Sequence, residues 1–141
     1  MKIPRNKLLV RRFVQEVFEE LRPDAVDVLV ADGFVSHSWP STGEGKSDLK
    51  AATQRMADAL TDVRFTIEDM IAEEDRVCVR LTASAKQVGE LMGMPPSGRS
   101  YKIGEIHIFR LWDGRIVEHW DELDAMGMMK QLTGDSTGRP G

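Results

Sequence analysis

Residues 101–123 read YKIGEIHIFRLWDGRIVEHWDEL, and this stretch decides the fold. Two runs rich in β-branched and aromatic residues, 101–112 and 115–123, flank the dipeptide Asp113-Gly114. Asp-Gly favours a type I′ turn, whose twist matches that of two strands joined by a two-residue loop. The pattern therefore predicts an antiparallel β-hairpin, and it is the strongest hairpin signal in the chain.

Two further strands are predicted before this hairpin. Apolar and polar residues alternate over 63–67 and again over 77–83, which is the period of a half-buried strand. The phase slips at 69–71, which suggests a bulge, and the acidic run 73–75 forms the turn. A long irregular connection at 89–97 then leads to the hairpin, so the four segments form an antiparallel meander.

The first part of the chain has a helical period instead. Apolar residues recur every four positions over 9–21, which predicts an amphipathic helix. A second short helix is predicted over 24–30, ended by the Asp-Gly pair at 32–33, and then a brief strand over 34–39. Ser47 is expected to cap a third helix. Helices followed by an antiparallel meander indicate an α+β fold, a curved sheet wrapped by N-terminal helices that can enclose a pocket.

The length of 141 residues suits one domain, and 41% hydrophobic with 30% charged residues is an ordinary globular balance. We expect this single domain over 1–132. Its last element is a short Met-rich helix over 124–132, and 133–141 form a flexible tail.

Composition also excludes several classes of function. The net charge of −4, with both signs interspersed, argues against a nucleic-acid partner, and no run reaches the roughly 18 apolar residues of a membrane span. No secretory-type apolar block follows the charged N-terminus, so we expect a cytoplasmic protein. One cysteine and three histidines, without HxxxH or CxxC spacing, predict neither a disulfide nor a metal site.

Strand alternation groups the candidate catalytic side chains. His107 and Phe109 share one face of their strand, and His119 and Asp121 share one face of the next. Counting from the turn places His107 opposite Trp120 or Asp121, and a slip of one residue reverses the face. The register that joins His107 to Asp121 gives an acid–base pair in an apolar cavity. Burial would raise the pKa of Asp121 and a cationic imidazole would lower it; the sequence does not decide between them.

Each of these three polar residues also has a purely structural interpretation. Asp121 can be a solvated strand residue paired with a lysine or arginine, because most carboxylates face water. His107 can be a hydrogen-bonded interior histidine, and His119 can be a surface residue.

Five residues are candidates for substrate contact: His37, Trp39, Phe109, His119 and Trp120. His37 and Trp39 precede a Gly-rich loop, where they either line a pocket mouth or end a packed strand. Trp120 lies between charged neighbours, so it either forms a pocket wall or anchors a partner surface.

Three motifs resemble those of the SnoaL-like polyketide cyclases. Residues 89–99, GELMGMPPSGR, are similar to a GxxxGxPPTGR segment, EIHIFRL follows at 105–111, and DGRIVEHWD at 113–121 is similar to DGKIxEHWD. The match runs in order along nearly the whole chain. It departs at Gln87-Val88, where the family pattern has His or Thr, so the polarity of the pocket stays open.

The resemblance implies a cone-shaped α+β barrel of the nuclear transport factor 2-like (cystatin-like) superfamily. It implies a cyclase that closes a ring in a small hydrophobic carbonyl compound by intramolecular aldol condensation, or related lyase or isomerase chemistry, without a cofactor. Asp121 matches the family's general acid/base and His107 its nearby histidine. A non-catalytic small-molecule binding module with the same pocket, or a dimerisation scaffold, is the alternative.

A homodimer or larger oligomer is also expected. Ile106 and Ile108 face away from His107, and open faces of such sheets are usually covered by a second copy.

Overall fold

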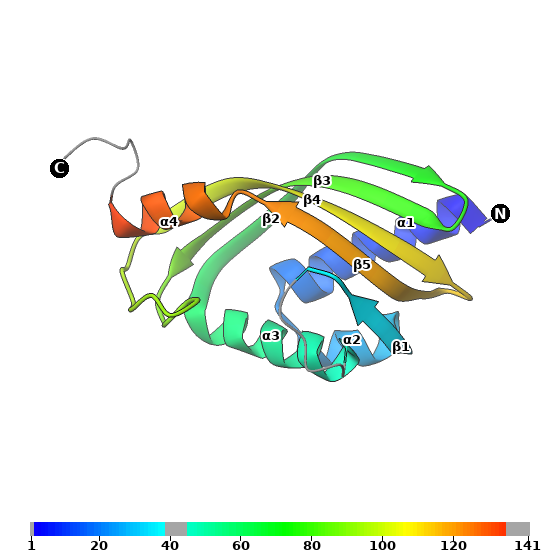
Figure 1. Ribbon diagram of the computed structural model, residues 1–141, viewed down its shortest axis with the longest axis horizontal. Coiled ribbons are helices and arrows are strands. Elements are labelled where there is room, and N and C mark those ends of the chain that lie inside the picture. Colours follow the sequence, from blue (N-terminus) through cyan, green and yellow to red (C-terminus); the bar gives the residue numbers. More distant parts are fainter. Residues whose placement is uncertain (1, 39–44, 135–141) are drawn as a thin grey trace.

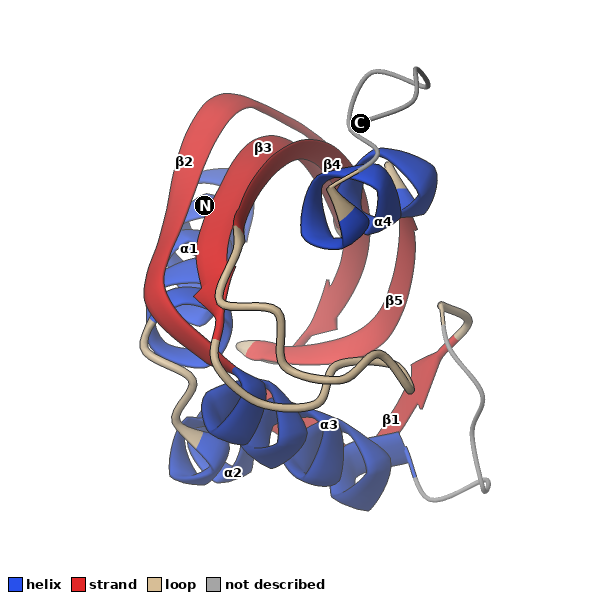
Figure 2. Cartoon of the chain, turned by 90° about the vertical axis from the view of Figure 1, so that its left-hand side faces the viewer, coloured by secondary structure: helices blue, strands red, loops and turns tan. Residues whose placement is uncertain are grey.

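A five-stranded sheet, in the order β1-β5-β4-β3-β2, curls around the helices of the first half of the chain (Figures 1 and 2). The computed structural model describes residues 2–38 and 45–134. In chain order the elements are α1 (Lys2–Phe13), the π-helix η1 (Val14–Glu19), α2 (Pro23–Leu29), β1 (Val30–Ser36), α3 (Gly45–Ala59), β2 (Leu60–Glu73), β3 (Arg76–Gln87), β4 (Ser100–Trp112), β5 (Arg115–Leu123) and α4 (Ala125–Thr133).

The predicted meander and α+β class are confirmed. Strands β2 to β5 pair antiparallel in sequence order, and β1 adds to β5 in parallel. The sheet is curved but remains open, with β1 and β2 at its edges. In Figure 2, α1, α2 and α3 lie on its concave side. Helix α4 lies near the start of β4 and the end of β5 (Figure 1). No described helix has the length and apolar character needed to span a bilayer.

The hairpin forms at the predicted turn. Asp113 and Gly114 have φ angles of 51° and 75°, as a tight turn between two strands requires. Leu111 pairs with Ile116, but the register then shifts, so that Val117 is an extra residue on β5. This bulge moves every later pairing by one residue and thereby decides which side chains of β5 face inward.

Two apolar clusters fill the concave side of the sheet. The first joins the N-terminal helices to the first half of β3, the end of β4 and the start of β5. The second lies where α4 and the 88–99 connection meet the sheet. Along β4, Tyr101 and Ile103 belong to the second cluster, whereas Phe109 and Leu111 belong to the first. The two inward-facing positions between them hold polar side chains, so a polar group interrupts the core at this level.

Two local expectations were wrong. The Asp-Gly pair at 32–33 does not end the second helix but lies inside β1, which runs from Val30 to Ser36 beside β5. Pairing with a neighbouring strand outweighs the turn preference of this dipeptide. The third helix begins at Gly45, so Ser47 lies in its first turn; a Cβ at Gly45 would overlap the Phe34 carbonyl group.

Candidate functional site

The two polar positions on β4 meet the inward face of β5. His107 pairs directly with Asp121, and Phe109 pairs with His119. A straight count from the turn would have placed His107 opposite Trp120; the bulge at Val117 brings Asp121 there instead. The register that joins His107 to Asp121 is therefore the observed one.

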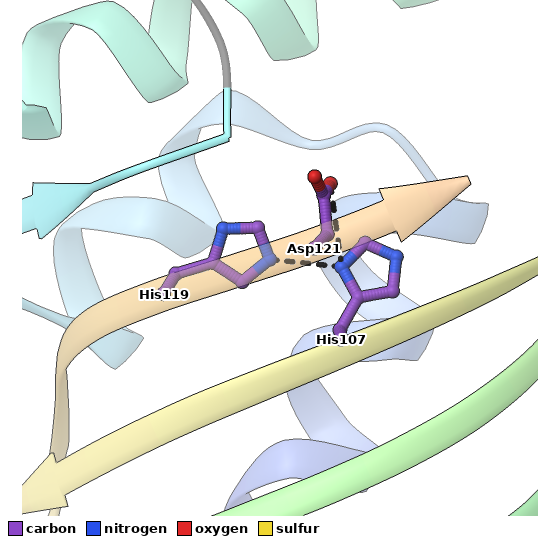
Figure 3. Close-up of side chains that lie close together, drawn as sticks. All are labelled: His107, His119 and Asp121. Atoms are coloured by element: carbon purple, nitrogen blue, oxygen red, sulfur yellow. Dashed lines mark hydrogen bonds and ion pairs between the residues drawn. The ribbon is translucent and has the colours of Figure 1, made fainter. Parts of the chain in front are cut away.

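Two imidazoles and one carboxyl group form the centre of the cluster (Figure 3). His107 Nδ1 lies 2.8 Å from His119 Nε2 and 3.6 Å from Asp121 Oδ2. Both histidines are only 2% exposed, and the Asp121 side chain is 9% exposed. His107 is thus a hydrogen-bonded interior histidine, and Asp121 points inward beside it. His119 is buried as well and is not a surface residue.

A second carboxylate contacts the other nitrogen of His107. Glu105 Oε1 lies 2.8 Å from His107 Nε2, and Glu105 is 8% exposed. The sequence places Glu105 on the same strand face, two residues before His107, but gave no reason to assign it a role. Its signal is this spacing, since positions i and i+2 of a strand lie side by side.

Two serines from β1 and its end complete the cluster at the far side of His119. The Oγ atoms of Ser36 and Ser38 each lie 3.3 Å from His119 Nδ1. The backbone also ties this segment to β5, since the His37 N–H donates to the His119 carbonyl at 2.9 Å. Ser36 and Ser38 flank His37, so an inward position for these serines sends His37 outward.

Aromatic rings surround the two imidazoles. Phe18 lies 4.8 Å from His107 between ring centroids, and Phe109 lies 4.9 Å from His119. Phe18 belongs to η1, where the predicted single helix widens into a π-helix, a feature often found at functional sites. Phe109 is fully buried and packs on Phe13, so its contact with the cluster comes from the core side.

This environment shifts two pKa values. Burial raises the pKa of Asp121 above its ordinary value, and it outweighs the opposing effects of His107 and of a hydrogen bond from Ser38. Burial, followed by the charge of His107, holds the pKa of His119 well below its ordinary value. The cluster therefore contains a carboxylate that is a stronger base than usual and an imidazole that stays neutral.

His37 and Trp120 lie on the other side of the sheet from this cluster. His37 stacks on Trp120 with centroids 5.1 Å apart, and its Nε2 lies 2.7 Å from Glu118 Oε2. Arg76 covers the Trp120 ring at 5.0 Å, and Arg110 bonds to Glu118 at 2.7 Å. These contacts clamp β1 to β5 from outside, so the structure does not bring these two candidates to His107. Trp39, the remaining candidate, lies outside the described residues.

His107, His119 and Asp121 each offer one atom that can coordinate a metal ion, and these three atoms lie within 4.8 Å of one another. The two nearest of these atoms face each other at the distance of a hydrogen bond, 2.8 Å. In this arrangement one nitrogen donates to the other, so the geometry is that of a proton-sharing pair.

Two of the surface hollows among the described residues have volumes of about 340 and 350 Å³. One lies over Gly104 between β3, β4 and β5, and the other lies between β1 and the start of α3. His107, His119 and Asp121 line neither hollow. The candidate site is therefore defined by its chemistry rather than by a surface hollow.

Known proteins match this chain along nearly its whole length. The profile of the family described as SnoaL-like polyketide cyclase matches residues 8–132. Aklanonic acid methyl ester cyclase DauD of Streptomyces sp. (strain C5) is 30% identical over 134 residues, covering 88% of this chain and 79% of that protein. Nogalonic acid methyl ester cyclase of Streptomyces nogalater is 35% identical over 123 residues, covering 82% of this chain and 88% of that protein.

A solved structure agrees in fold as well as in sequence. TsrD from Streptomyces laurentii matches with a TM-score of 0.85 at 31% identity, covering 94% of this chain and 97% of that one. Together with the helices inside a curved, open sheet, these matches establish the fold class and the family. The chain belongs to the SnoaL-like polyketide cyclase family and has its nuclear transport factor 2-like α+β fold.

Proposed function

We propose that this protein is a cofactor-independent enzyme that cyclises a small polyketide-like carbonyl compound by acid–base catalysis, with Asp121 as general acid/base and His107 as its partner. The observation that carries this proposal is the inward Asp121 carboxyl group, 3.6 Å from His107 Nδ1 and 9% exposed. Its raised pKa supports the assignment, because a stronger carboxylate base removes a carbon-bound proton more readily.

The reaction conserves protons overall. Asp121 removes a proton from a carbon between two carbonyl groups, and the electron pair is delocalised over the carbonyl oxygens as an enolate. The enolate carbon attacks a second carbonyl carbon of the same molecule, which forms the ring C–C bond and leaves an alkoxide. The alkoxide then takes the proton back from Asp121. The substrate supplies much of the carbanion stabilisation, and the protein supplies placement and proton transfer.

The surroundings of the cluster suit a substrate of this class. Phe18 presents an apolar ring beside His107, which favours a largely hydrophobic molecule. The two curated relatives are named as methyl ester cyclases, so we propose a polyketide methyl ester with a 1,3-dicarbonyl unit as the substrate.

The test compares Asp121→Asn with the wild type on aromatic polyketide methyl esters, with the cyclised product measured by mass spectrometry and affinity by calorimetry. We expect a loss of about 10²–10⁴-fold in turnover with affinity retained, the usual scale for a general base. Glu122→Gln is the matched control, because Glu122 is the next residue on β5 and is exposed.

Turnover that survives in Asp121→Asn would remove the general-base role. A wild type that binds these esters but converts none of them would favour the binding-module alternative.

A further inference from the structure

We propose that Glu105 is the positioning residue that fixes His107 as its Nε2–H tautomer and leaves Nδ1 as the basic nitrogen that faces Asp121. The catalytic consequence of this inference rests on the proposed function, whereas the tautomer itself does not. Glu105 is not proposed to touch the substrate; it acts through His107.

An ionised carboxylate only accepts hydrogen bonds, whereas each nitrogen of a neutral imidazole either donates or accepts. Glu105 Oε1 lies 2.8 Å from His107 Nε2, so an ionised Glu105 requires the proton of His107 to be on Nε2. The cross-strand neighbours of Glu105 are Leu81 on β3 and Leu123 on β5, which offer no competing polar side chain.

This choice sets the direction of the whole hydrogen-bonded chain. With Nε2 protonated, Nδ1 of neutral His107 accepts, and His119 Nε2 at 2.8 Å must donate to it. His119 Nδ1 is then an acceptor for the hydroxyl groups of Ser36 and Ser38, each at 3.3 Å. Burial is the main cause of the lowered pKa of His119, and it keeps His119 neutral, as this arrangement requires.

The orientation matters for the fate of the proton on Asp121. After Asp121 has removed a proton from carbon, its O–H bond can break as an N–H bond forms at His107 Nδ1, and the reverse step returns the proton. Because Nδ1 has a single lone pair, the hydrogen bond that it accepts from His119 Nε2 must break for this transfer. The 3.6 Å separation of Oδ2 and Nδ1 must shorten for this transfer, as catalytic hydrogen bonds commonly do in a substrate complex. The imidazolium formed would donate from Nε2 to Glu105, which opposes its charge.

Glutamine has nearly the same shape as glutamate but is uncharged, so Glu105→Gln tests the charge and the hydrogen-bond direction of Glu105 separately from its size. Its side-chain amide can donate as well as accept, so it satisfies either tautomer of His107 while filling the same space. Glu105→Gln should therefore release the tautomer while keeping a hydrogen bond to His107 Nε2. Glu105→Asp keeps an acceptor-only group and is the conservative variant.

The experiment records two-bond ¹H–¹⁵N correlation spectra of ¹⁵N-histidine-labelled protein near neutral pH, without substrate. His107 signals are assigned by their loss in His107→Gln. We expect wild-type His107 to carry its proton on Nε2, Glu105→Gln to populate the Nδ1–H form, and Glu105→Asp to retain the wild-type tautomer. In the cyclase assay, Glu105→Gln should lower kcat on the order of a hundredfold with KM nearly unchanged, the scale of a misplaced catalytic group.

Glu118→Gln is the matched control, because Glu118 also contacts a histidine nitrogen, that of His37 at 2.7 Å, but on the outer side of the sheet. It should change the His37 signals and leave the His107 tautomer and turnover as in the wild type. A wild-type His107 protonated on Nδ1 overturns the proposal without any variant, as does Glu105→Gln with an unchanged tautomer. An inactive wild type with the expected tautomer would overturn the proposed function and leave Glu105 as the residue that sets the tautomer.

Discussion

His107 and Asp121 face each other directly across the β4–β5 pair, with Nδ1 and Oδ2 3.6 Å apart, while Glu105 contacts the opposite nitrogen of the same ring at 2.8 Å. One imidazole thus lies between two carboxyl groups. Their environments differ, because Glu105 is tied to His107 by a short hydrogen bond and Asp121 has a raised pKa through burial. When two nearby carboxyl groups lie in such different environments, the one with the raised pKa is the candidate for the acid–base role.

Asp121 should reduce the stability of the folded protein near neutral pH. Burial raises its pKa above the ordinary value of 3.8, so between these two values the native state binds this proton when the unfolded chain does not. The Asp121 contribution to the free energy of unfolding therefore falls as pH rises through that window. Asp121→Asn cannot ionise, so we expect it to be more stable than the wild type near neutral pH by about 0.5–2 kcal/mol.

Urea unfolding at several pH values measures this difference, which should vanish under acid conditions where Asp121 is protonated in both states. Glu122→Gln provides the baseline for loss of one negative charge. An Asp121→Asn variant that is less stable than the wild type near neutral pH would contradict a burial-raised pKa.

His119 should give the opposite dependence on pH. Its pKa is held well below the ordinary value of 6.5 by burial and then by His107, so below 6.5 the unfolded chain binds a proton that the native state excludes. The stability that His119 contributes is present above this pH and is lost as pH falls below it, by up to about 1.4 kcal/mol per pH unit.

His119→Gln should flatten this part of the curve of unfolding free energy against pH. His37→Gln is the control, because the His37 side chain is 43% exposed and lies on the outer side of the sheet. Equal slopes in the wild type and His119→Gln would show that His119 accepts a proton freely in the folded protein.

The sequence predicted the hairpin and the inward strand faces because both depend on local signals, a two-residue turn and a period of two. It left the register open by one residue, since the bulge at Val117 has no distinct signature among the β-branched residues around it. That single residue decides whether Asp121 or Trp120 lies opposite His107. The motif resemblance chose Asp121, and the observed register agrees with that choice.

The contacts of His119 could not be predicted in the same way. They depend on the parallel pairing of β1 with β5, which joins Ser36 to His119 across 83 residues of sequence. Non-local pairing has no periodic signal in either segment, and the Asp-Gly pair at 32–33 pointed to a turn instead. For this reason the sequence points to His37 as a candidate and not to the serines on either side of it.

Gln87, where the motif departs from the family pattern, should stabilise the 88–97 connection. It is fully buried, and its side-chain Nε2 donates to the carbonyl groups of Gly89, Met94 and Pro95 at 3.0, 3.2 and 3.1 Å. Its Oε1 accepts from the Ser97 hydroxyl at 2.6 Å. Gln87→Ala would leave several of these groups unpaired, so we expect a loss of about 2–4 kcal/mol in the free energy of unfolding.

Urea unfolding measures the effect, with Val88→Ala as the control because Val88 is 49% exposed. The side chain of Gln87 bonds to the connection and not to His107, so the His107 tautomer in Gln87→Ala should be that of the wild type. A Gln87→Ala variant as stable as the control would mean that water replaces the amide without cost.

The outer face of the sheet should form the contact between two copies of the chain. Cross-strand pairing places one row of mainly apolar side chains across this face: Ile71, Cys78, Ile108 and Trp120. Ile106, beside this row, is 46% exposed and points away from His107. We propose a homodimer that covers this face, because apolar side chains in a row on an open sheet favour association with a second sheet.

Light scattering coupled to size-exclusion chromatography should give a dimer or larger assembly for the wild type and a monomer for Ile106→Glu, since a buried, unpaired carboxylate opposes association. Leu8→Glu is the matched control, because Leu8 is 68% exposed but lies on α1, away from this face. A wild type that stays monomeric at high concentration excludes the dimer. Dissociation by Leu8→Glu alone would place the interface on the N-terminal helix instead of the sheet.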